Sequence, residues 1–314
     1  MKAGVAALWF VLFVASACSS VRAQDSVTVR LVRDPMSNPV PMVELTTAGG
    51  VSGRFALDSG ISDSCISYRF AAHAGLKTEP VFDDNGRPQV VAGQAVQKAP
   101  RVEFSAGGFP IRFERIAVLS EAYVRRRPGL SVDGVLGHDF FSHCAVEIDY
   151  AAGVARFLNA SEVTADGLAR AGFAHAIRVA TTEIYDGDLS AIYADLPAHL
   201  RVRMVLDTGA PCTMVAYETA TSLRAARAFI SRAVATPTEG GLPMRAKIKR
   251  LAVGGAVRTG QEVAYDSKLD KNADPELGFD FMRHFRVLLD LPRHTVYFVP
   301  NPPRPGLPGG PTPQ

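Results

Sequence analysis

The stretch RFALDSGISDSCIS, residues 54–67, places Asp58 between an apolar run and a Ser-Gly pair. Aspartate, serine and glycine are all common in turns, so this stretch alone is typical of a strand that ends in a turn. The stretch RMVLDTGAPCTMV, residues 203–215, repeats the apolar run and places Asp207 before Thr-Gly. Two such stretches in one chain are much rarer by chance than one, so the repetition itself requires an explanation.

A second pair of similar stretches lies downstream, GVLGHDFFSHCAVEIDYAAGVARFL at residues 134–158 and PELGFDFMRHFRVLLDLPRHTVYFV at residues 275–299. Four pairs of residues in them are separated by the same 141 positions: Gly137 and Gly278, Asp139 and Asp280, Asp149 and Asp290, Phe157 and Phe298. One offset over four landmarks indicates an internal repeat. We therefore expect two similar lobes, residues 24–162 and 163–300.

Short apolar or alternating runs dominate the chain, for example SVTVRLV at residues 26–32 and GVARFL at residues 153–158. Gly, Pro, Asp and Asn separate these runs, a pattern typical of strands joined by turns. Helical patterns are brief, and 314 residues suffice for two lobes with a large core. The sequence predicts an all-β protein of two pseudo-symmetric lobes with short helices.

The N-terminus has the pattern of an export signal. Lys2 precedes an apolar run, residues 5–17, which is typical of a secretory signal peptide. Cleavage before Gln24 would remove residues 1–23 and give a periplasmic or secreted protein. In an alternative interpretation, ASACSS is a bacterial lipoprotein cleavage site and Cys18 carries the lipid. The run is shorter than the roughly 20 residues of a spanning helix, so we expect no membrane span.

The overall composition is that of an ordinary globular protein, with 47% hydrophobic and 21% charged residues. A net charge of +3 is too small to indicate a nucleic-acid partner. The last stretch, NPPRPGLPGGPTPQ at residues 301–314, is mostly Pro and Gly and predicts a disordered tail.

Taken together, these motifs resemble the aspartic protease superfamily, and within it the retropepsin-like bacterial branch. In that family a strand ends in Asp-Ser/Thr-Gly, and two apolar residues with a glycine follow later. Here FALDSG is followed by VLG at residues 135–137, and MVLDTG is followed by ELG at residues 276–278. The resemblance covers nearly all of the chain after residue 23. It implies two β-barrel-like lobes, a monomer that is an internal pseudo-dimer, and a peptide or protein substrate without a cofactor.

The resemblance also implies a role for each motif residue. Asp58 and Asp207 would be the catalytic pair of an aspartic endopeptidase, because two close carboxyl groups share one proton and can activate a water together. The residues expected to support the aspartate loops are Ser59, Gly60, Thr208 and Gly209. The residues expected to pack against those loops are Leu136, Gly137, Leu277 and Gly278.

Two residues depart from the family pattern. Glu276 takes the place of an apolar residue, and Ile61 follows the first Ser-Gly, where Ala, Ser or Thr is usual. The alternative function is therefore a protease-like protein that binds peptides or a partner without cleaving them. Retention of both aspartates favours the enzyme, since a binding protein has no need of two repelling carboxylates.

The cysteines offer one candidate pair. Cys65 follows the first aspartate loop, and Cys144 follows the glycine motif expected to pack against that loop. An oxidising compartment outside the cytoplasm favours disulfides, so we expect these two cysteines to form one.

Motifs of other enzyme classes are missing from the sequence, including a G-x-S-x-G elbow, a Walker loop and H-E-x-x-H. His138 and His143 are five positions apart, a poor spacing for metal ligands, and we expect no metal site. Asp139 and Asp280 are interpreted as carboxylates at helix starts, without a function of their own.

Overall fold

The computed structural model describes residues 26–32, 39–83, 85–91, 93–124, 131–231, 233–235, 244–265 and 274–302. The expected signal peptide and Cys18 lie outside these ranges, as does the expected tail beyond residue 302. Within the described ranges, no helix combines the length and the apolar character that crossing a membrane requires.

A seven-stranded sheet built from the first half of the chain closes on itself. Its strands are β2 (Met42–Thr47), β3 (Ser52–Leu57), β4 (Cys65–Ser67), β5 (Glu79–Pro80), β8 (Gln97–Ala106), β9 (Phe109–Leu119) and β10 (Gly134–Leu136). They are ordered β2-β3-β10-β4-β9-β8-β5, and β2 also pairs with β8, which makes the sheet barrel-like. A separate hairpin and two helices complete this half: β6 (Val90–Val91), β7 (Gln94–Ala95), α1 (Tyr68–His73) and α2 (Glu121–Val124).

The second half of the chain builds a similar seven-stranded sheet. Its strands are β14 (Thr182–Ile184), β15 (Leu189–Leu196), β16 (Leu200–Leu206), β17 (Val234–Ala235), β18 (Met244–Val253), β19 (Ala256–Tyr265) and β20 (Glu276–Leu277). The path is β17-β18-β15-β16-β20, with β14 on β15 and β19 on β18. The helix α5 (Tyr217–Ala225) follows the second aspartate loop, as α1 follows the first.

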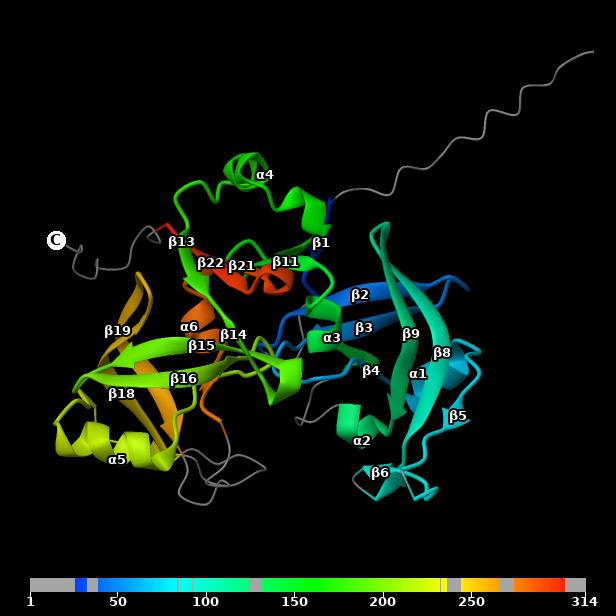
Figure 1. The fold of residues 1–314 in the computed structure, drawn as a ribbon, viewed down its shortest axis with the longest axis horizontal. Helices are drawn as coiled ribbons and strands as arrows, with labels where there is room; N and C mark the ends of the chain where they lie inside the picture. The colour runs from blue at the N-terminus through cyan, green and yellow to red at the C-terminus, as the bar shows by residue number, and fades with distance from the viewer. Residues whose placement is uncertain are drawn as a thin grey trace, which may run out of the picture.

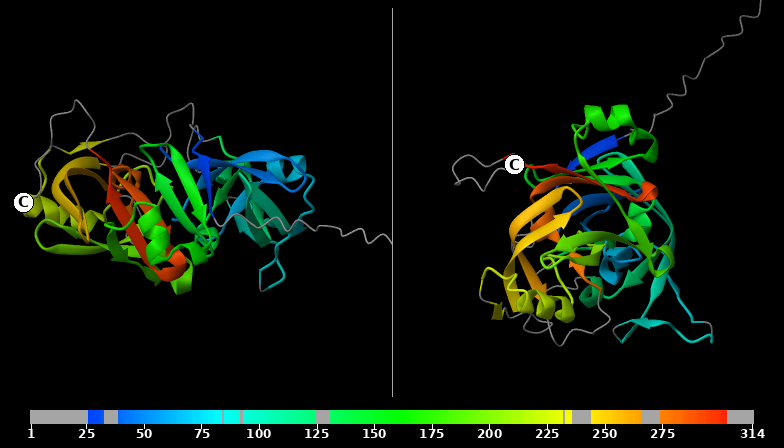
Figure 2. Two further views of the ribbon diagram at one scale, coloured as in Figure 1. Left: turned by 90° about the horizontal axis from the view of Figure 1, so that it is seen from above. Right: turned by 60° about the vertical axis from the view of Figure 1, so that its left-hand side comes forward.

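A third sheet joins the halves and contains strands from both (Figure 1). Its six strands are β1 (Ser26–Arg30), β11 (Ala145–Asp149), β12 (Val154–Leu158), β13 (Ile177–Ala180), β21 (Phe285–Asp290) and β22 (Thr295–Pro300). Their order is β1-β12-β11-β21-β22-β13. Figure 2 shows the green and red strands of this sheet between the two outer parts. Short helices flank the sheets: α3 (His138–Phe141), η1 (Ala160–Glu162), α4 (Ala165–Arg170), η2 (Tyr185–Gly187), α6 (Phe279–Met282) and η3 (Leu291–Arg293).

The central strand pair of the joining sheet demonstrates the pseudo-twofold symmetry. In β11 and β21, Val146 pairs with Leu289 and Glu147 pairs with Leu288. Because Glu147 and Leu288 are themselves 141 positions apart, the pair consists of equivalent residues, and the pseudo-twofold axis passes between them. The predicted all-β, two-lobed fold is confirmed. The boundary between residues 162 and 163 stays a prediction, since the joining sheet belongs to both halves.

Strand alternation explains how each half forms its core. In β9, residues 109, 111 and 113 are buried and the residues between them are exposed, the period of two expected of a strand with one face toward a core. Phe55 packs edge-on against Phe70 and Phe104, with ring centroids 5.5 and 5.1 Å apart. The main apolar core runs through both halves, so they fold against each other as well as internally.

One buried ionic cluster crosses the joining sheet. The Glu147 carboxylate lies 2.7 Å from Nη2 of Arg156 on β12 and 3.1 Å from Nε of Arg286 on β21. Burial raises the pKa of Glu147, and the two guanidinium groups partly oppose that shift. The Arg286 guanidinium also stacks over Phe173, 4.6 Å from the ring centroid. This cluster ties β11 of the first half to β21 of the second.

Candidate active site

Each predicted aspartate follows a strand whose end is held by a parallel neighbour. Asp58 follows β3, which pairs with β10, and its backbone N donates to the carbonyl of Leu136 at 3.0 Å. Asp207 follows β16, which pairs with β20, and its backbone N donates to the carbonyl of Leu277 at 3.2 Å. Both leucine side chains are fully buried. The two expected packing leucines therefore lie directly beside the aspartate strands.

The glycine after each of these leucines lets the aspartate loop lie against the motif. A Cβ on Gly137 would come within 2.8 Å of the Asp63 backbone, and one on Gly278 within 2.5 Å of the Cys212 carbonyl oxygen. Real Cβ atoms do not make such contacts with backbone, so a larger residue here would push the loop away. Close packing against the aspartate loop thus explains why a glycine follows each of these leucines.

The two loops are locked together by Ser59 and Thr208, both fully buried. The Ser59 backbone N donates to Thr208 Oγ1 at 3.0 Å, and the Thr208 backbone N donates to Ser59 Oγ at 3.1 Å. Each hydroxyl in turn donates across the junction, Ser59 to the Leu206 carbonyl at 2.6 Å and Thr208 to the Leu57 carbonyl at 2.8 Å. Every polar group in this buried ring is satisfied, which is the condition for a stable buried network.

Gly60 and Gly209 lie against the carboxylate of the opposite loop. A Cβ on Gly60 would be 2.3 Å from Cγ of Asp207, and a Cβ on Gly209 would be 2.2 Å from Cγ of Asp58. This reciprocal contact brings both carboxylates to the junction of the halves. Asp207 is buried, with 7% of its surface exposed, whereas Asp58 is half-buried.

Backbone amides donate to both carboxylates. The Gly60 N lies 3.1 Å from Oδ1 of Asp58, and the Ala210 N lies 2.8 Å from Oδ1 of Asp207. Hydrogen bonds of this kind stabilise the ionised form of a carboxyl group. Sequence reasoning missed Ala210 as a donor, because its side chain carries no polar atom and only the loop geometry shows where its N–H points.

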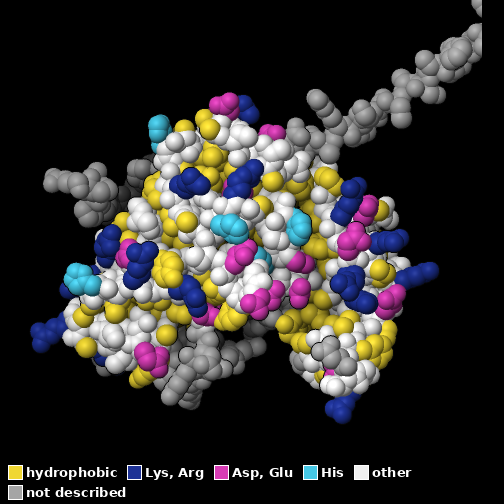
Figure 3. Space-filling model, viewed as in Figure 1, with side chains coloured by type: hydrophobic (Ala, Val, Ile, Leu, Met, Phe, Trp, Pro, Cys, Tyr) yellow, Lys and Arg dark blue, Asp and Glu magenta, His cyan; other side chains and the backbone are white. Residues whose placement is uncertain are grey.

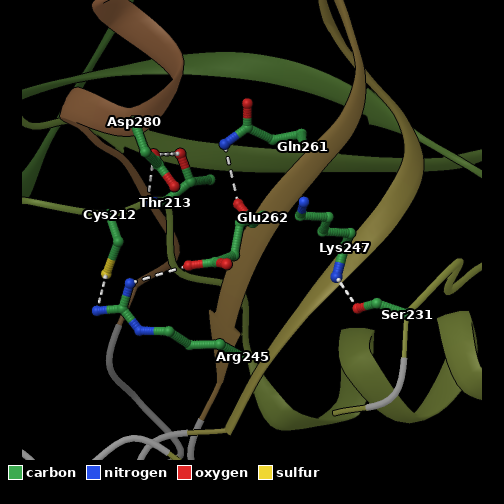
Figure 4. Close-up of polar contacts among 8 residues, drawn as sticks. All are labelled: Cys212, Thr213, Ser231, Arg245, Lys247, Gln261, Glu262 and Asp280. Atoms are coloured by element: carbon green, nitrogen blue, oxygen red, sulfur yellow. Dashed lines mark hydrogen bonds and ion pairs between the residues drawn. The ribbon is translucent and has the colours of Figure 1, made fainter. Parts of the chain in front are cut away.

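A second pair of carboxylates braces the loops. Oδ1 of Asp280 accepts from the Thr213 backbone N at 2.7 Å and from Thr213 Oγ1 at 2.6 Å (Figure 4). Oδ1 of Asp139 makes the equivalent contacts with Ser64, at 2.9 and 2.5 Å. Burial raises the pKa of Asp280 to about 6, although the Thr213 hydrogen bonds oppose the shift.

The sequence interpretation of Asp139 and Asp280 as carboxylates at helix starts did not include their contacts with the aspartate loops. A signal was present in the repeat itself. Ser64 and Thr213 are 149 positions apart, as Asp58 and Asp207 are, so a small hydroxyl residue recurs at the same distance after each aspartate.

A cleft of about 700 Å³ opens above the two aspartates and is lined by Asp58, Gly60, Asp207 and Gly209. Its first-half wall is a separate apolar cluster, which we call the first wall, of Val40, Ala56, Cys65, Val96, Leu119, Val124 and Val135. From the second half, only Asp207, Gly209 and Glu276 line it among the described residues. The two walls of the cleft are therefore chemically different.

The hairpin of β6 and β7 borders the cleft through Gln89, Val91 and Val96. The Tyr68 hydroxyl from α1 donates to the Ala95 carbonyl and holds the hairpin to the first half. Tyr123 from α2 also lines the cleft. Aromatic side chains thus reach this region from the helices.

Carboxylates of both halves meet at one end of the cleft. Burial raises the pKa of Asp63, and the charges of Asp139 and Asp188 raise it further. Asp188 belongs to the turn between β14 and β15, in which Tyr185 and Asp186 both have a left-handed backbone, with φ of 54° and 56°. Figure 3 shows acidic side chains gathered near the middle of the molecule. Of these three carboxylates, Asp63 and Asp139 line the cleft.

The expected disulfide between Cys65 and Cys144 is wrong. Both residues are buried thiols, and they belong to different apolar clusters, Cys65 to the first wall and Cys144 to the main core. Burial raises the pKa of the Cys144 thiol. Cys212 is also a thiol, and its Sγ lies 3.6 Å from Nη2 of Arg245 (Figure 4). Packing of the glycine motif against the loop thus leaves the two cysteine side chains in separate apolar clusters.

His138 makes a polar contact with the second half of the chain. Its Nε2 lies 3.0 Å from Ser190 Oγ, and burial lowers the pKa of the ring. Across the part of the chain that the structure describes, no group of three or more His, Cys, Asp or Glu side chains is placed to hold a metal ion.

Comparisons with known proteins identify the fold. No protein-family model matches the chain, and no curated protein matches its sequence. An aspartic proteinase from Irpex lacteus has a similar structure, with a TM-score of 0.55, 14% identity, and coverage of 88% of this chain and 97% of that one. Conglutin gamma, a basic 7S globulin from lupine seeds, has a TM-score of 0.54 and 13% identity, and the match covers 88% of this chain and 95% of that one. Basic 7S globulin from soybean has a TM-score of 0.50 and 12% identity, and the match covers 87% of this chain and 94% of that one.

At such identities the likeness shows the fold alone. The same two-lobed architecture occurs in proteins called proteinases and in proteins called seed globulins. The chain therefore has the pepsin-like fold, and its activity has to be argued from the site.

Proposed function

We propose that the chain is an aspartic endopeptidase that hydrolyses peptide bonds with Asp58 and Asp207. The observation that carries this proposal is the reciprocal contact in which each carboxylate lies against the glycine of the opposite loop. A protein that only needed the fold would gain nothing from bringing two like charges to one junction, since close carboxylates repel unless they share a proton.

The geometry suits general acid–base chemistry on a water molecule. The ionised carboxylate takes a proton from the water as its oxygen bonds to the scissile carbonyl carbon, while the protonated carboxyl gives its proton to the carbonyl oxygen. The C–N bond of this tetrahedral species then breaks, and the leaving nitrogen takes a proton from the pair. No covalent bond to the protein forms. The amides of Gly60 and Ala210 hold the two carboxyl groups in position.

Cleavage of casein and of a fluorogenic peptide library at acidic pH, with and without pepstatin, tests the proposal. We expect hydrolysis that pepstatin blocks and that Asp58→Asn and Asp207→Asn abolish. Asp166→Asn is the matched control, because Asp166 lies exposed on α4, away from the cleft. Absence of hydrolysis by the folded wild-type protein across this pH range would overturn the proposal.

The alternative function, a protein that binds peptides without cleaving them, is favoured by one observation. Glu276, which departs from the family pattern, lines the cleft itself. The same experiment separates the two functions, since the alternative predicts that pepstatin or peptides bind in the cleft and remain intact.

A further inference from the structure

We propose that Glu276 is a specificity-determining residue that selects a lysine or arginine side chain on one side of the bond to be cleaved. This inference rests on the proposed function, because it names a substrate class for the same cleft. It is carried by the position of Glu276 in the cleft and by a comparison of the two walls.

Glu276 lies on the floor of the cleft beside the aspartates. It is the first residue of β20, it pairs with Val205 on the parallel strand β16, and β16 leads directly to Asp207. A bridge to Met214, from the end of the second aspartate loop, holds it on the other side. Glu276 is half-buried, and it lines the same cleft as Asp58 and Asp207.

The equivalent residue in the first half is apolar. Val135 is 141 positions before Glu276, and it pairs with Ala56 and Cys65 as Glu276 pairs with Val205 and Met214. Val135 is buried, with 5% of its surface exposed, among the apolar side chains of the first wall. The same place beside the catalytic loops is thus apolar on one wall and carries a carboxylate on the other.

The hairpins β8–β9 and β18–β19 have the same register, and one of two equivalent charged positions in them carries opposite charges in the two halves. Lys98 pairs with Ala117 as Arg245 pairs with Ala264, so the cationic Lys98 and Arg245 are equivalent. By the same register, Arg115 is equivalent to Glu262.

Only the first-half members of these pairs line the cleft. Lys98 and Arg115 do so, whereas Arg245 and Glu262 bind each other at 3.0 Å (Figure 4). Lys98 and Arg115 repel a basic substrate side chain on the first-half side of the cleft, which Asp63 and Asp139 also line. On the second-half side, the carboxylate of Glu276 attracts it. Complementary and opposing charges placed in this way discriminate between ligands.

Paired peptide substrates test the proposal. The two peptides of a pair differ only by lysine or norleucine at one of the two positions that flank the cleaved bond. For one of these positions we expect wild-type protein to have a kcat/KM about 10- to 100-fold higher for the lysine peptide, the range that a hydrogen bond to a charged group provides. A glutamate at the same position should be disfavoured.

Glu276→Gln keeps the shape and removes the charge, and we expect it to bring the lysine-to-norleucine ratio to about 1. Glu276→Asp keeps the charge and should retain part of the preference, so the result does not depend on a single variant. Glu103→Gln is the matched control: Glu103 is an exposed residue paired with Arg112 and outside the cleft, and the ratio should not change. A wild-type ratio near 1 at both positions, or an unchanged ratio in Glu276→Gln, would overturn the proposal.

Uncleavable analogues separate this inference from the proposed function. Peptides with a reduced amide at the scissile position, again with lysine or norleucine beside it, are titrated into the wild-type and Glu276→Gln proteins by calorimetry. Tighter binding of the lysine analogue that is lost in Glu276→Gln supports the role of Glu276 even if no substrate is hydrolysed. Hydrolysis without any lysine preference overturns only the role of Glu276. Failure of every analogue to bind overturns both proposals.

Discussion

The two halves of the molecule agree closely at the aspartate loops and differ at the walls around them. Ser59 and Thr208 exchange equivalent hydrogen bonds, and Gly60 and Gly209 make equivalent contacts with the opposite carboxylates. The walls beside these loops do not correspond in chemistry. Positions that shape the loop backbone have therefore stayed equivalent, while positions that face the cleft have diverged.

A second difference lies in the joining sheet. Glu147 and its equivalent Leu288 sit opposite each other at the pseudo-twofold axis, and only the first carries a charge. The ionic cluster with Arg156 and Arg286 therefore has no counterpart across the axis. Backbone pairing here is symmetric even though the side chains are not, because strand register depends on the backbone and on the pattern of buried residues.

The strongest test of the equivalence of the loops is the loss of either aspartate. Asp58→Asn and Asp207→Asn should each lower kcat/KM by about 10⁴-fold, because each removes one member of a proton-sharing pair and leaves the side-chain volume unchanged. Thermal melting should show that both variants remain folded. A large loss in one variant with near wild-type activity in the other would mean that the halves contribute unequally to the chemistry.

The asymmetry at the axis predicts a large stability effect. Glu147→Gln should lower the free energy of unfolding by about 3 to 5 kcal/mol, since it leaves Arg156 and Arg286 without their buried carboxylate. Denaturant titration measures the change. The control Glu103→Gln removes an exposed pair with Arg112 and should cost less than about 1 kcal/mol. Equal costs for the two variants would show that the cluster does not hold the halves together.

The loop lock predicts equal effects in the two halves. Ser59→Ala and Thr208→Ala should each cost about 2 to 3 kcal/mol, because each leaves a buried N–H and a buried carbonyl without their partners. Thr208→Ser keeps the hydroxyl and should cost less than either. Chemical denaturation measures all three variants, and a strongly unequal cost for the two alanine variants would contradict the equivalence of the loops.

The Asp280 brace should make the stability of the protein depend on pH. Asp280 has a pKa of about 6 in the folded protein and a lower value when unfolded, so the folded state holds the extra proton between about pH 4 and 6. The free energy of unfolding should therefore fall by about 2 kcal/mol as the pH rises through this window. Above the window, Asp280 should contribute no further change.

Asp280→Asn should reduce the decrease in the free energy of unfolding between pH 4 and 6, because an amide oxygen can still accept from Thr213 but does not titrate. Asp139→Asn is the matched variant in the first half. Urea titrations at pH 4, 5 and 6 compare the slopes, and an unchanged slope in Asp280→Asn would show that another group is responsible.

Much of the fold and the centre of the site could be predicted from local patterns. The apolar runs and the 141-position repeat indicated two similar β lobes, and the Asp-Ser-Gly and Asp-Thr-Gly stretches indicated the loops that the structure brings together. The short helices α3 and α6 begin at His138 and Phe279, directly after the repeated glycines Gly137 and Gly278, which are their N-cap residues. Local chemistry was sufficient for these features.

The features that could not be predicted depend on which side of a strand faces which neighbour. Cys65 follows the first aspartate loop and Cys144 follows the glycine motif that packs against this loop, yet the two side chains lie in separate apolar clusters. The contact of Glu147 with Arg286 requires the register of β11 against β21, which residues far apart in the chain determine together. The sequence marked Glu276 as a departure from a pattern, but its place in the cleft follows only from the pairing of β20 with β16.

The unlike pair Val135 and Glu276 has a consequence for the direction in which a polypeptide lies in the cleft. A peptide has distinct amino and carboxyl ends, whereas a site with perfect twofold symmetry offers identical surroundings to a chain running either way. With an apolar side chain at one equivalent position and a carboxylate at the other, turning a peptide end for end in the cleft would exchange its surroundings at these two positions. Because both lobes belong to one chain, their sequences can differ, and such a cleft can favour one orientation of a bound peptide over the other.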